Sequence, residues 1–452
     1  MRRLRYFYFF TLLILAFFSS PVLCQEESEA TKSFEMENGI KVYLYERHNV
    51  PLIHTVFAFN IGSKDEDETT SGLVHVLEHY ILFRGTHLRS GQQVGIDIRR
   101  HGAYFNAHTG RDLSLFELSF PSEHLDFALK NQKDILFNLQ VSQEELDEEK
   151  QVILEEYNQM EDDPQNYALS LFHQNLFTGH SYESPLHGIR DVIQSLTPEL
   201  LEKFYAHYFV PENCALAVVG DFDIVDMEAK VQQYFSDIPR SGLIQKDFPM
   251  AESITKNIEV TKEMDVNKAT MIIGTLGPDY NNTSQYNVDV LAQVLGRGIS
   301  PLLTIALRGR RDLVDSAYMG YSAYKFGGAI YAYLTLDPKD IKTVRRQALE
   351  FLKSAWRINF SKKDYLGESR QYALDYLANA KNQILFDYHQ SQENGLNIAV
   401  SLARYLLLNN KPERGKYLDY IEAIDSSDLR ETASQFLGKG KYVIITITPK
   451  KK

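Results

Sequence analysis

A series of strand-like and helix-like segments occurs twice along this chain, and this repetition limits the folds that it can adopt. Hydrophobic periodicity predicts mixed strands and helices up to residue 220, and the same alternation starts again after residue 238. This pattern predicts an α+β protein with two similar domains of about 200 residues each, joined by a proline-containing linker over 238–259. The expected strands are 40–45, 52–61, 113–120, 215–219, 269–274, 329–336 and 442–447, and the main helices are 70–84, 144–157, 198–208, 285–295 and 301–308.

The composition excludes several classes of protein. Hydrophobic residues make up 44% of the chain and charged residues 24%, values that are typical of soluble globular proteins. The formal net charge of −12 argues against binding to nucleic acid or to an anionic membrane. Only two cysteines occur, Cys24 and Cys214, so a disulfide scaffold and a thiolate-rich metal site are both excluded. A metal ion would therefore need histidine and carboxylate ligands.

The start of the chain is typical of a secretory signal. Three arginines precede an apolar run over 6–18, and polar residues follow from Gln25. The run is shorter than the roughly 20 residues of a spanning helix, so we expect cleavage and no integral membrane segment in the mature chain. The mature protein is then extracytoplasmic, either periplasmic or secreted, and lipid attachment through Cys24 is the less favoured alternative. We expect a signal peptide at 1–24, an N-terminal domain at 25–240 and a C-terminal domain at 241–452.

One predicted helix carries the residues best suited to chemistry. His75, Glu78 and His79 stand at positions i, i+3 and i+4 of the segment 70–84 and share one face. Two imidazoles one turn apart can bind a single metal ion, and the carboxylate beside them can polarise a water molecule. The order His-x-x-Glu-His is the inverted zincin signature. Because the helix is apolar nearly all round, we expect it to be buried and its polar side chains to serve a purpose.

A second, acidic helix can supply a third metal ligand. Ser142 followed by Glu145 predicts a capping box that opens this helix. Glu149 and Glu156 are seven residues apart, so they share one of its faces. Charge patterning alone favours solvent-exposed positions for the carboxylates of so acidic a segment, and by itself it does not single out a ligand.

These motifs resemble the M16 family of metallopeptidases, which includes pitrilysin, insulysin and the mitochondrial processing peptidase. His75, Glu78 and His79 match the family's His-x-x-Glu-His, and Glu156 lies 77 positions after His79, at the spacing of the family's third zinc ligand. Glu149 matches the family's second carboxylate, seven residues earlier. The likeness covers most of residues 35–225, through NGIKVYLYERHNVP, GAYFNAHTGRDLSLFELSFP, EKQVILEEYNQMEDDP and YFVPENCALAVVGDFD.

The resemblance implies a LuxS/MPP-like metallohydrolase fold, in which two homologous domains form one half of a clamshell. It implies one Zn²⁺ per chain, held by His75, His79 and Glu156, whereas the adjacent Glu155 points about 100° away. Glu78 is then the general base that activates water, and Glu149 orients a ligand histidine.

The same resemblance implies a place for the substrate. Asn106 and Ala107 lie in the segment that is similar to the family's edge strand, which holds a peptide by strand addition. His108 follows them directly, and we expect it to face the substrate or to be structural, because the family spacing gives the third ligand position to Glu156.

The second half resembles the family's catalytically silent repeat. Of the 13 histidines, only His389 lies beyond His207, so residues 241–452 cannot form a histidine-rich site of their own.

Active family members carry in this repeat an arginine and a tyrosine, seven residues apart, that reach the substrate carbonyl from the opposing domain. Arg308 matches the arginine, but the nearest fitting tyrosine, Tyr318, lies ten positions on, whereas Arg311 stands seven before it. An insertion after Arg308, replacement by Arg311, and supply of the pair by a partner subunit are the three interpretations. Tyr321 and Tyr324 are further candidates.

Taken as a whole, the sequence predicts an extracytoplasmic zinc endopeptidase that acts on peptides or unfolded segments. Family members of this length dimerise to build a closed chamber, so we expect a homodimer or a heterodimer with a zinc-less homologue. The alternative function is a non-catalytic subunit of such a heteromeric complex.

Overall fold

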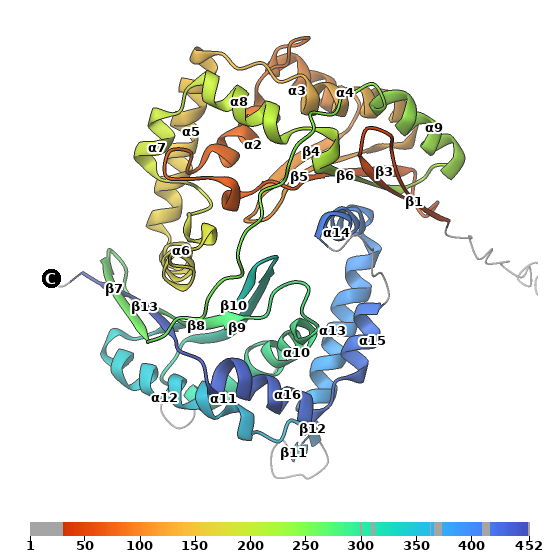
Figure 1. Ribbon diagram of the computed structural model, residues 1–452. Helices are drawn as coiled ribbons and strands as arrows, with labels where there is room; N and C mark the ends of the chain where they lie inside the picture. Colours follow the sequence, from red (N-terminus) through yellow and green to blue (C-terminus); the bar gives the residue numbers. More distant parts are fainter. Residues whose placement is uncertain are drawn as a thin grey trace, which may run out of the picture.

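The computed structural model describes residues 30–298, 301–308, 312–361, 363–365, 373–408 and 416–450. It contains two lobes, each built on one β-sheet with helices packed against it (Figure 1). The predicted mixed α and β architecture with two similar units is confirmed. The expected signal segment 1–24 with Cys24, and also Arg311, lie outside the described residues. Within the ranges that the structure covers, no helix is long and apolar enough to cross a membrane.

The first lobe contains a six-stranded sheet with the strand order β1-β2-β6-β3-β5-β4. β2 and β6 are parallel, and all other neighbours are antiparallel. β4 pairs only with β5, so its outer edge is open among the described strands. The strands are β1 Thr31–Glu35, β2 Lys41–Glu46, β3 Leu52–Phe59, β4 Tyr104–Thr109, β5 Ser114–Pro121 and β6 Cys214–Gly220.

The second lobe contains a five-stranded sheet with the order β7-β13-β8-β10-β9. The last strand of the chain, β13, lies inside this sheet, parallel to β7 and antiparallel to β8. A separate pair of short strands, β11 and β12, accompanies it. The strands are β7 Ile258–Met264, β8 Ala269–Gly277, β9 Ser316–Tyr324, β10 Gly327–Leu336, β11 Lys363–Tyr365, β12 Ala373–Asp375 and β13 Val443–Pro449.

The helices cover both faces of each sheet, which explains why the central strands are apolar at nearly every position rather than at every second one. In the first lobe they are α2 Leu73–Phe83, α3 Gly91–Arg100, α4 Leu125–Phe137, α5 Gln143–Asp162, α6 Pro164–Leu176, α7 Arg190–Ser195, α8 Pro198–Tyr208 and α9 Ile224–Phe235. In the second they are α10 Ser284–Gly296, α11 Leu302–Arg308, α12 Ile341–Ser354, α13 Tyr376–Glu393, α14 Gly395–Leu408, α15 Lys416–Ala423 and α16 Ser426–Thr432.

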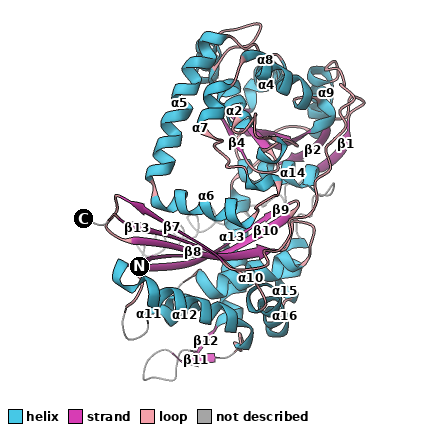
Figure 2. Ribbon diagram, turned by 60° about the vertical axis from the view of Figure 1, so that its left-hand side comes forward, coloured by secondary structure: helices cyan, strands magenta, loops and turns pink. Residues whose placement is uncertain are grey.

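Each half of the chain gives one helix to the sheet of the other half. α6, which follows the long α5, packs against β13 and β8 of the second sheet, as Figure 2 shows. In return, α14 packs against β6 and β3 of the first sheet (Figure 1). The two lobes are therefore joined by an exchange of helices as well as by a linker.

Complementary side chains make this exchange possible. Phe172 of α6 is fully buried, and its ring lies over Gly274 of β8, where a Cβ atom would come within 2.4 Å of the ring. On the other sheet, Ile398 and Leu402 of α14 pack in one buried cluster with Val56. Each sheet thus buries its second face only when the other half of the chain is in place.

Candidate metal centre

Helix α2 carries the histidine motif in a buried position. Its residues from Leu73 to Ile81 are all buried, as the apolar pattern predicts. The Glu66 carboxylate accepts the backbone N–H groups of Gly72 and Val74, at 2.9 Å each, and so satisfies donors at the start of the helix. Gly72 has φ +93°, a left-handed conformation that favours glycine. These contacts therefore fix the first turn of α2, in which the His-x-x-Glu-His motif begins.

Tyr80 joins α2 to the acidic helix α5. Ser142 caps α5 as predicted, because its Oγ accepts the N–H of Glu145 at 3.3 Å. The second half of the predicted capping box differs. The Glu145 carboxylate accepts the Tyr80 hydroxyl at 2.9 Å, and the Ser142 N–H donates to Tyr80 Oη at 2.9 Å. A tyrosine from α2 thus completes the cap and sets the position of α5.

Three side chains from these two helices converge on one point. Nε2 of His79 lies 3.3 Å from Oε2 of Glu156, and Nε2 of His75 lies 3.9 Å from the same oxygen. One ligand atom from each residue lies within 4.8 Å of the other two. Two imidazole nitrogens and a carboxylate oxygen are a ligand set that suits Zn²⁺ and leaves room for a fourth ligand. The neighbouring Glu155 is exposed and outside this cluster.

Glu149 orients His79 through Nδ1, the ring nitrogen that does not face the metal position. Its Oε1 lies 2.9 Å from His79 Nδ1, and its Oε2 accepts the Nε–H of Arg84 at 2.7 Å. Burial alone would raise the pKa of Glu149, but the hydrogen bonds from His79 and Arg84 outweigh it and lower that pKa. The carboxylate therefore stays ionised and leaves His79 Nε2 free to face the metal position. Arg84 was not foreseen from the sequence, since no spacing rule links it to Glu149.

His75 has a different environment. Burial lowers its pKa to about 3, so the imidazole is neutral and able to bind a metal ion. Its ring lies 5.0 Å from the ring of His187, centroid to centroid. The close contact of two glycine backbones places His187 there, because a Cβ atom at Gly188 would lie 2.4 Å from the Cα of Gly72. Sequence reasoning missed His187, and only this packing reveals it.

Glu78 lies beside the cluster but is not part of it. It is buried, with an exposed fraction of 9%, and burial raises its pKa above that of an ordinary glutamate. Thr109 and His108, at the end of β4, are among the groups that oppose this shift. A carboxylate with a raised pKa near a metal position is suited to accept and release a proton.

Strand β4 brings the two expected substrate-binding residues to the open edge of the sheet. Asn106 and Ala107 stand opposite Glu117 and Phe116 of β5, so their outer side faces no described strand. α2 packs against β4, which places this edge next to the histidine motif. His108 is exposed and lies 3.4 Å from Glu117, not in the metal-ligand set.

A cavity of about 580 Å³ opens beside the metal-ligand set. Glu156 and His187 line it from the first lobe, and Ser322 and Tyr324 of β9 line it from the second. Among the tyrosines considered from sequence, Tyr324 is therefore the one that shares a cavity with the metal-ligand set.

Arg308 and Tyr318 lie elsewhere in the second lobe. Arg308 donates to the backbone carbonyls of Val314 and Asp315, near its own helix. The Tyr318 hydroxyl donates to the hydroxyl of Tyr331 at 3.4 Å. Neither residue lines the cavity beside Glu156.

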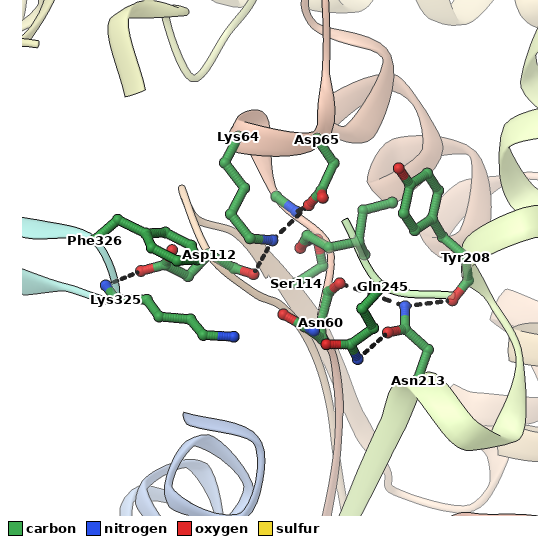
Figure 3. A network of polar contacts seen from close by, with 12 residues as sticks. Asn60, Lys64, Asp65, Asp112, Ser114, Tyr208, Asn213, Gln245, Lys325 and Phe326 are labelled. Carbon is green, nitrogen blue, oxygen red and sulfur yellow. Dashed lines mark hydrogen bonds and ion pairs between the residues drawn. The ribbon is translucent and has the colours of Figure 1, made fainter. Parts of the chain in front are cut away.

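The tip of the β9–β10 hairpin is tied to the first lobe. Asp112 accepts the backbone N–H of Lys325 at 2.9 Å, and its own backbone carbonyl accepts Lys64 Nζ at 3.1 Å (Figure 3). The Tyr182 hydroxyl donates to the Asp112 carboxylate and accepts the N–H of Phe326 at 3.2 Å. These contacts fix the hairpin that carries Tyr324.

Comparison with protein families shows two matches that together cover most of the chain. Residues 42–189 match the model described as "Insulinase (Peptidase family M16)". Residues 195–371 match the model described as "Peptidase M16 inactive domain". The metal-ligand set lies wholly in the first match.

Similar proteins align with this chain over most of its length. The uncharacterized zinc protease YmxG of Bacillus subtilis is 24% identical over 82% of this chain and 93% of its own. An uncharacterized zinc protease of Rickettsia bellii is 26% identical over 89% of this chain and 93% of its own. Among solved structures, a protease from Helicobacter pylori superposes with a TM-score of 0.82 at 22% identity, covering 93% of this chain and all of the other. A structure described as a peptidase M16 inactive domain, from Pseudomonas fluorescens, gives 0.81 at 18% identity, covering 93% and 98%.

Proposed function

Because this chain belongs to the M16 family of peptidases, we propose that it is a zinc-dependent endopeptidase that hydrolyses peptides or unfolded segments. One observation carries the proposal. Ligand atoms of His75, His79 and Glu156 converge within 4.8 Å of one another. The buried carboxylate of Glu78 lies one turn after His75 on the same helix. The curated relatives named as zinc proteases support the choice of metal.

Two glutamates of this chain have distinct roles in the proposed hydrolysis. Zinc, when bound, polarises a peptide carbonyl and acidifies water. Glu78 accepts the proton of the attacking water and later delivers it to the leaving amine, for which its raised pKa suits it. Glu149 keeps His79 oriented through Nδ1, so that only Nε2 faces the metal.

The peptide itself is proposed to bind as an added strand. Among the strands that the structure describes, β4 is terminal, and its outer edge lies next to α2 with backbone groups that pair with no other strand. A peptide pairing with Asn106 and Ala107 would gain main-chain hydrogen bonds whatever its side chains are. This mode of binding favours extended or unfolded segments over folded proteins.

We place the mature chain in an extracytoplasmic compartment and propose that it works as a dimer. The N-terminal apolar run supports the location. Since Arg308 and Tyr318 do not line the cavity beside Glu156, we propose that a partner subunit supplies the arginine and tyrosine pair. The mass of the native complex, with the identity of each subunit, tests this part.

The test of the function combines zinc content with cleavage of an unfolded peptide by the mature chain. Stoichiometric zinc and cleavage are expected, and Glu78→Gln should keep the zinc while losing cleavage by several powers of ten. Glu156→Gln should lose zinc, and the matched control Glu155→Gln, one position away on the exposed side of α5, should not. Zinc without any cleavage, even with a partner subunit present, would instead support a non-catalytic subunit.

A further inference from the structure

We propose that the cavity beside the metal-ligand set binds a carboxylate group of the substrate through Arg111. This inference rests on the proposed peptidase function and adds a substrate class to it. Arg111 lines the cavity together with Glu156, His173 and Tyr324, so a group bound there lies next to the metal position.

Arg111 is a buried cation whose hydrogen-bonding capacity is only partly used. The residue has an exposed fraction of 5%. One terminal nitrogen donates to the backbone carbonyls of Tyr182 and Ser184, and Nε has no hydrogen-bond partner although it is buried. A guanidinium group has five N–H donors in a planar fork, so part of this fork remains for a ligand.

No carboxylate neutralises this charge among the described residues. None of the ion pairs found there includes Arg111, and of the described residues around the cavity only Glu156 is acidic. Glu156 is already used as a metal ligand in the proposed function. A buried charge without a counter-charge is costly, and a substrate carboxylate would remove that cost.

His173, next to Arg111 in the cavity, carries no charge that would compete for an anion or repel it. His173 is buried, and its pKa is lowered to about 3, first by burial and then by the nearby Arg111, so it is neutral. Its Nε2 lies 3.1 Å from the hydroxyl of Tyr324. The Cζ atom of Arg111 lies over the Tyr324 ring, 5.8 Å from the ring centroid, where the aromatic face attracts the cation.

Contacts around the cavity hold Arg111 in place. The following residue, Asp112, accepts the N–H of Lys325 at the hairpin tip, as Figure 3 shows. Tyr182 contacts both residues, since its carbonyl accepts from Arg111 and its hydroxyl donates to Asp112. The cation is therefore positioned before any ligand arrives, which reduces the entropy lost on binding.

The chemistry selects a carboxylate from a peptide. An arginine fork recognises a planar carboxylate by two parallel hydrogen bonds, and Met160, Leu169 and Leu186 provide apolar surface for the carbon atoms that carry it. Such a group comes either from an Asp or Glu side chain or from the C-terminus of the peptide. Both sources present the same group, and the experiment separates them.

The experiment uses two sets of matched peptides, cleaved by the zinc-loaded protein. In the first, a single Glu is moved through an otherwise neutral, C-terminally amidated peptide, and each member has a Gln counterpart. In the second, a Gln-only peptide is compared as free acid and as amide. We expect kcat/KM to favour the carboxylate by roughly tenfold or more at one Glu position, or for the free acid. Ratios near one throughout both sets overturn the proposal.

Substitution of Arg111 tests whether this preference arises at the cavity. Arg111→Gln is expected to bring the ratio close to one, and Arg111→Lys to keep part of it, since lysine retains the charge without the fork. Each ratio is measured within one protein preparation, so partial misfolding does not alter it. The exposed Arg346 gives the control Arg346→Gln, which should retain the full preference. A preference that survives Arg111→Gln overturns the assignment.

A binding measurement separates this inference from the proposed function. Glu78→Gln protein is titrated with the same peptide pairs, and fluorescence anisotropy reports the dissociation constants. Tighter binding of the carboxylate peptide, dependent on Arg111, supports the cavity assignment even if the wild-type protein cleaves nothing. Cleavage of both members with equal binding leaves the peptidase function standing and overturns the cavity assignment.

Discussion

At the scale of single residues, the two glutamates of α5 that contact His79, Glu149 and Glu156, have distinct tasks. Glu156 is partly exposed at the cavity, whereas Glu149 is buried between His79 and Arg84. Their seven-residue spacing could be read from the sequence, whereas their different roles followed only from the resemblance to the M16 family. The difference depends on Arg84 and on the depth of each position along α5, which only the packing of α5 on α2 defines.

The first prediction concerns Glu149. Glu149→Gln removes the charge that holds His79 Nδ1, so the affinity for Zn²⁺ is expected to fall by roughly 10- to 100-fold. Competition with a chelating dye measures this change. Glu148→Gln is the matched control, because Glu148 also contacts Arg84 but its side chain is 61% exposed. Equal losses in the two variants would contradict an orienting role for Glu149.

The second prediction concerns the partly buried Asp289 of α10. Burial raises its pKa to about 6, against 3.8 for the free side chain. The folded state therefore binds a proton more tightly than the unfolded state, and the resulting stability is present below pH 3.8 and lost as the pH rises through 6. Asp289→Asn should raise the free energy of unfolding by roughly 1–2 kcal/mol at pH 8. Urea titration at several pH values measures it.

The gain from Asp289→Asn should shrink as the pH falls below 6, because the wild-type carboxyl is then protonated in the folded state. Asp419→Asn, at an exposed position of α15, should change stability little at any of these pH values. A constant difference between Asp289→Asn and the wild type across the whole range would show that burial of this charge is not the cause.

At the scale of elements, the sequence predicted seven strands and five helices near their observed positions, but it missed others, such as α4, α6 and α13, and it did not predict which elements pack together. The segments 70–84 and 198–208 contain α2 and α8 as observed, because their apolar periods arise from local burial. The exchange of α6 and α14 was not predicted. An amphipathic helix shows that it packs against something, but its sequence does not say which sheet that is.

The metal-ligand set was predictable because two of its members lie in one helix and the third is at a recognisable spacing from them. His187, Arg111 and Tyr324 were not identified as one site. They come from the loop before α7, the turn between β4 and β5, and the end of β9, and only the tertiary contacts bring them together. Local pattern therefore predicts ligands on a helix better than it predicts a cavity between lobes.

The third prediction tests the contact between α6 and the second sheet. A Cβ atom at Gly274 would meet the Phe172 ring at 2.4 Å and the Ile330 carbonyl at 2.6 Å. Gly274→Ala should lower the free energy of unfolding by about 1–3 kcal/mol. Phe172→Ala also destabilises, but the double variant should be more stable than the sum predicts, by about 1 kcal/mol. Additive effects in denaturant titration would contradict the proposed contact.

At the scale of the whole molecule, the exchanged helices make the two lobes interdependent. The second face of the first sheet is covered by α14, and that of the second sheet by α6. Loss of either lobe exposes the apolar surface of the other. The chain is therefore expected to unfold as one cooperative unit despite its two sheets.

The fourth prediction uses two natural probes of this cooperativity. Trp356 is the only tryptophan and lies in the second lobe, while Cys214 is buried in β6 of the first. In protein that starts at Gln25, the fluorescence of Trp356 and the labelling of Cys214 should change at the same urea concentration. Two separated midpoints would show that the lobes unfold independently.

The position of β13 has a consequence for synthesis on the ribosome. This strand lies between β7 and β8, yet it is made after the other strands of this sheet. The strands of the first sheet are all made by residue 220, but one face of this sheet stays uncovered until α14 has been made. While translation continues, apolar strands of both sheets therefore remain open to other chains, which is the condition under which chaperones are needed. The synthesis of α14 and β13 therefore decides when a nascent chain becomes a folded one.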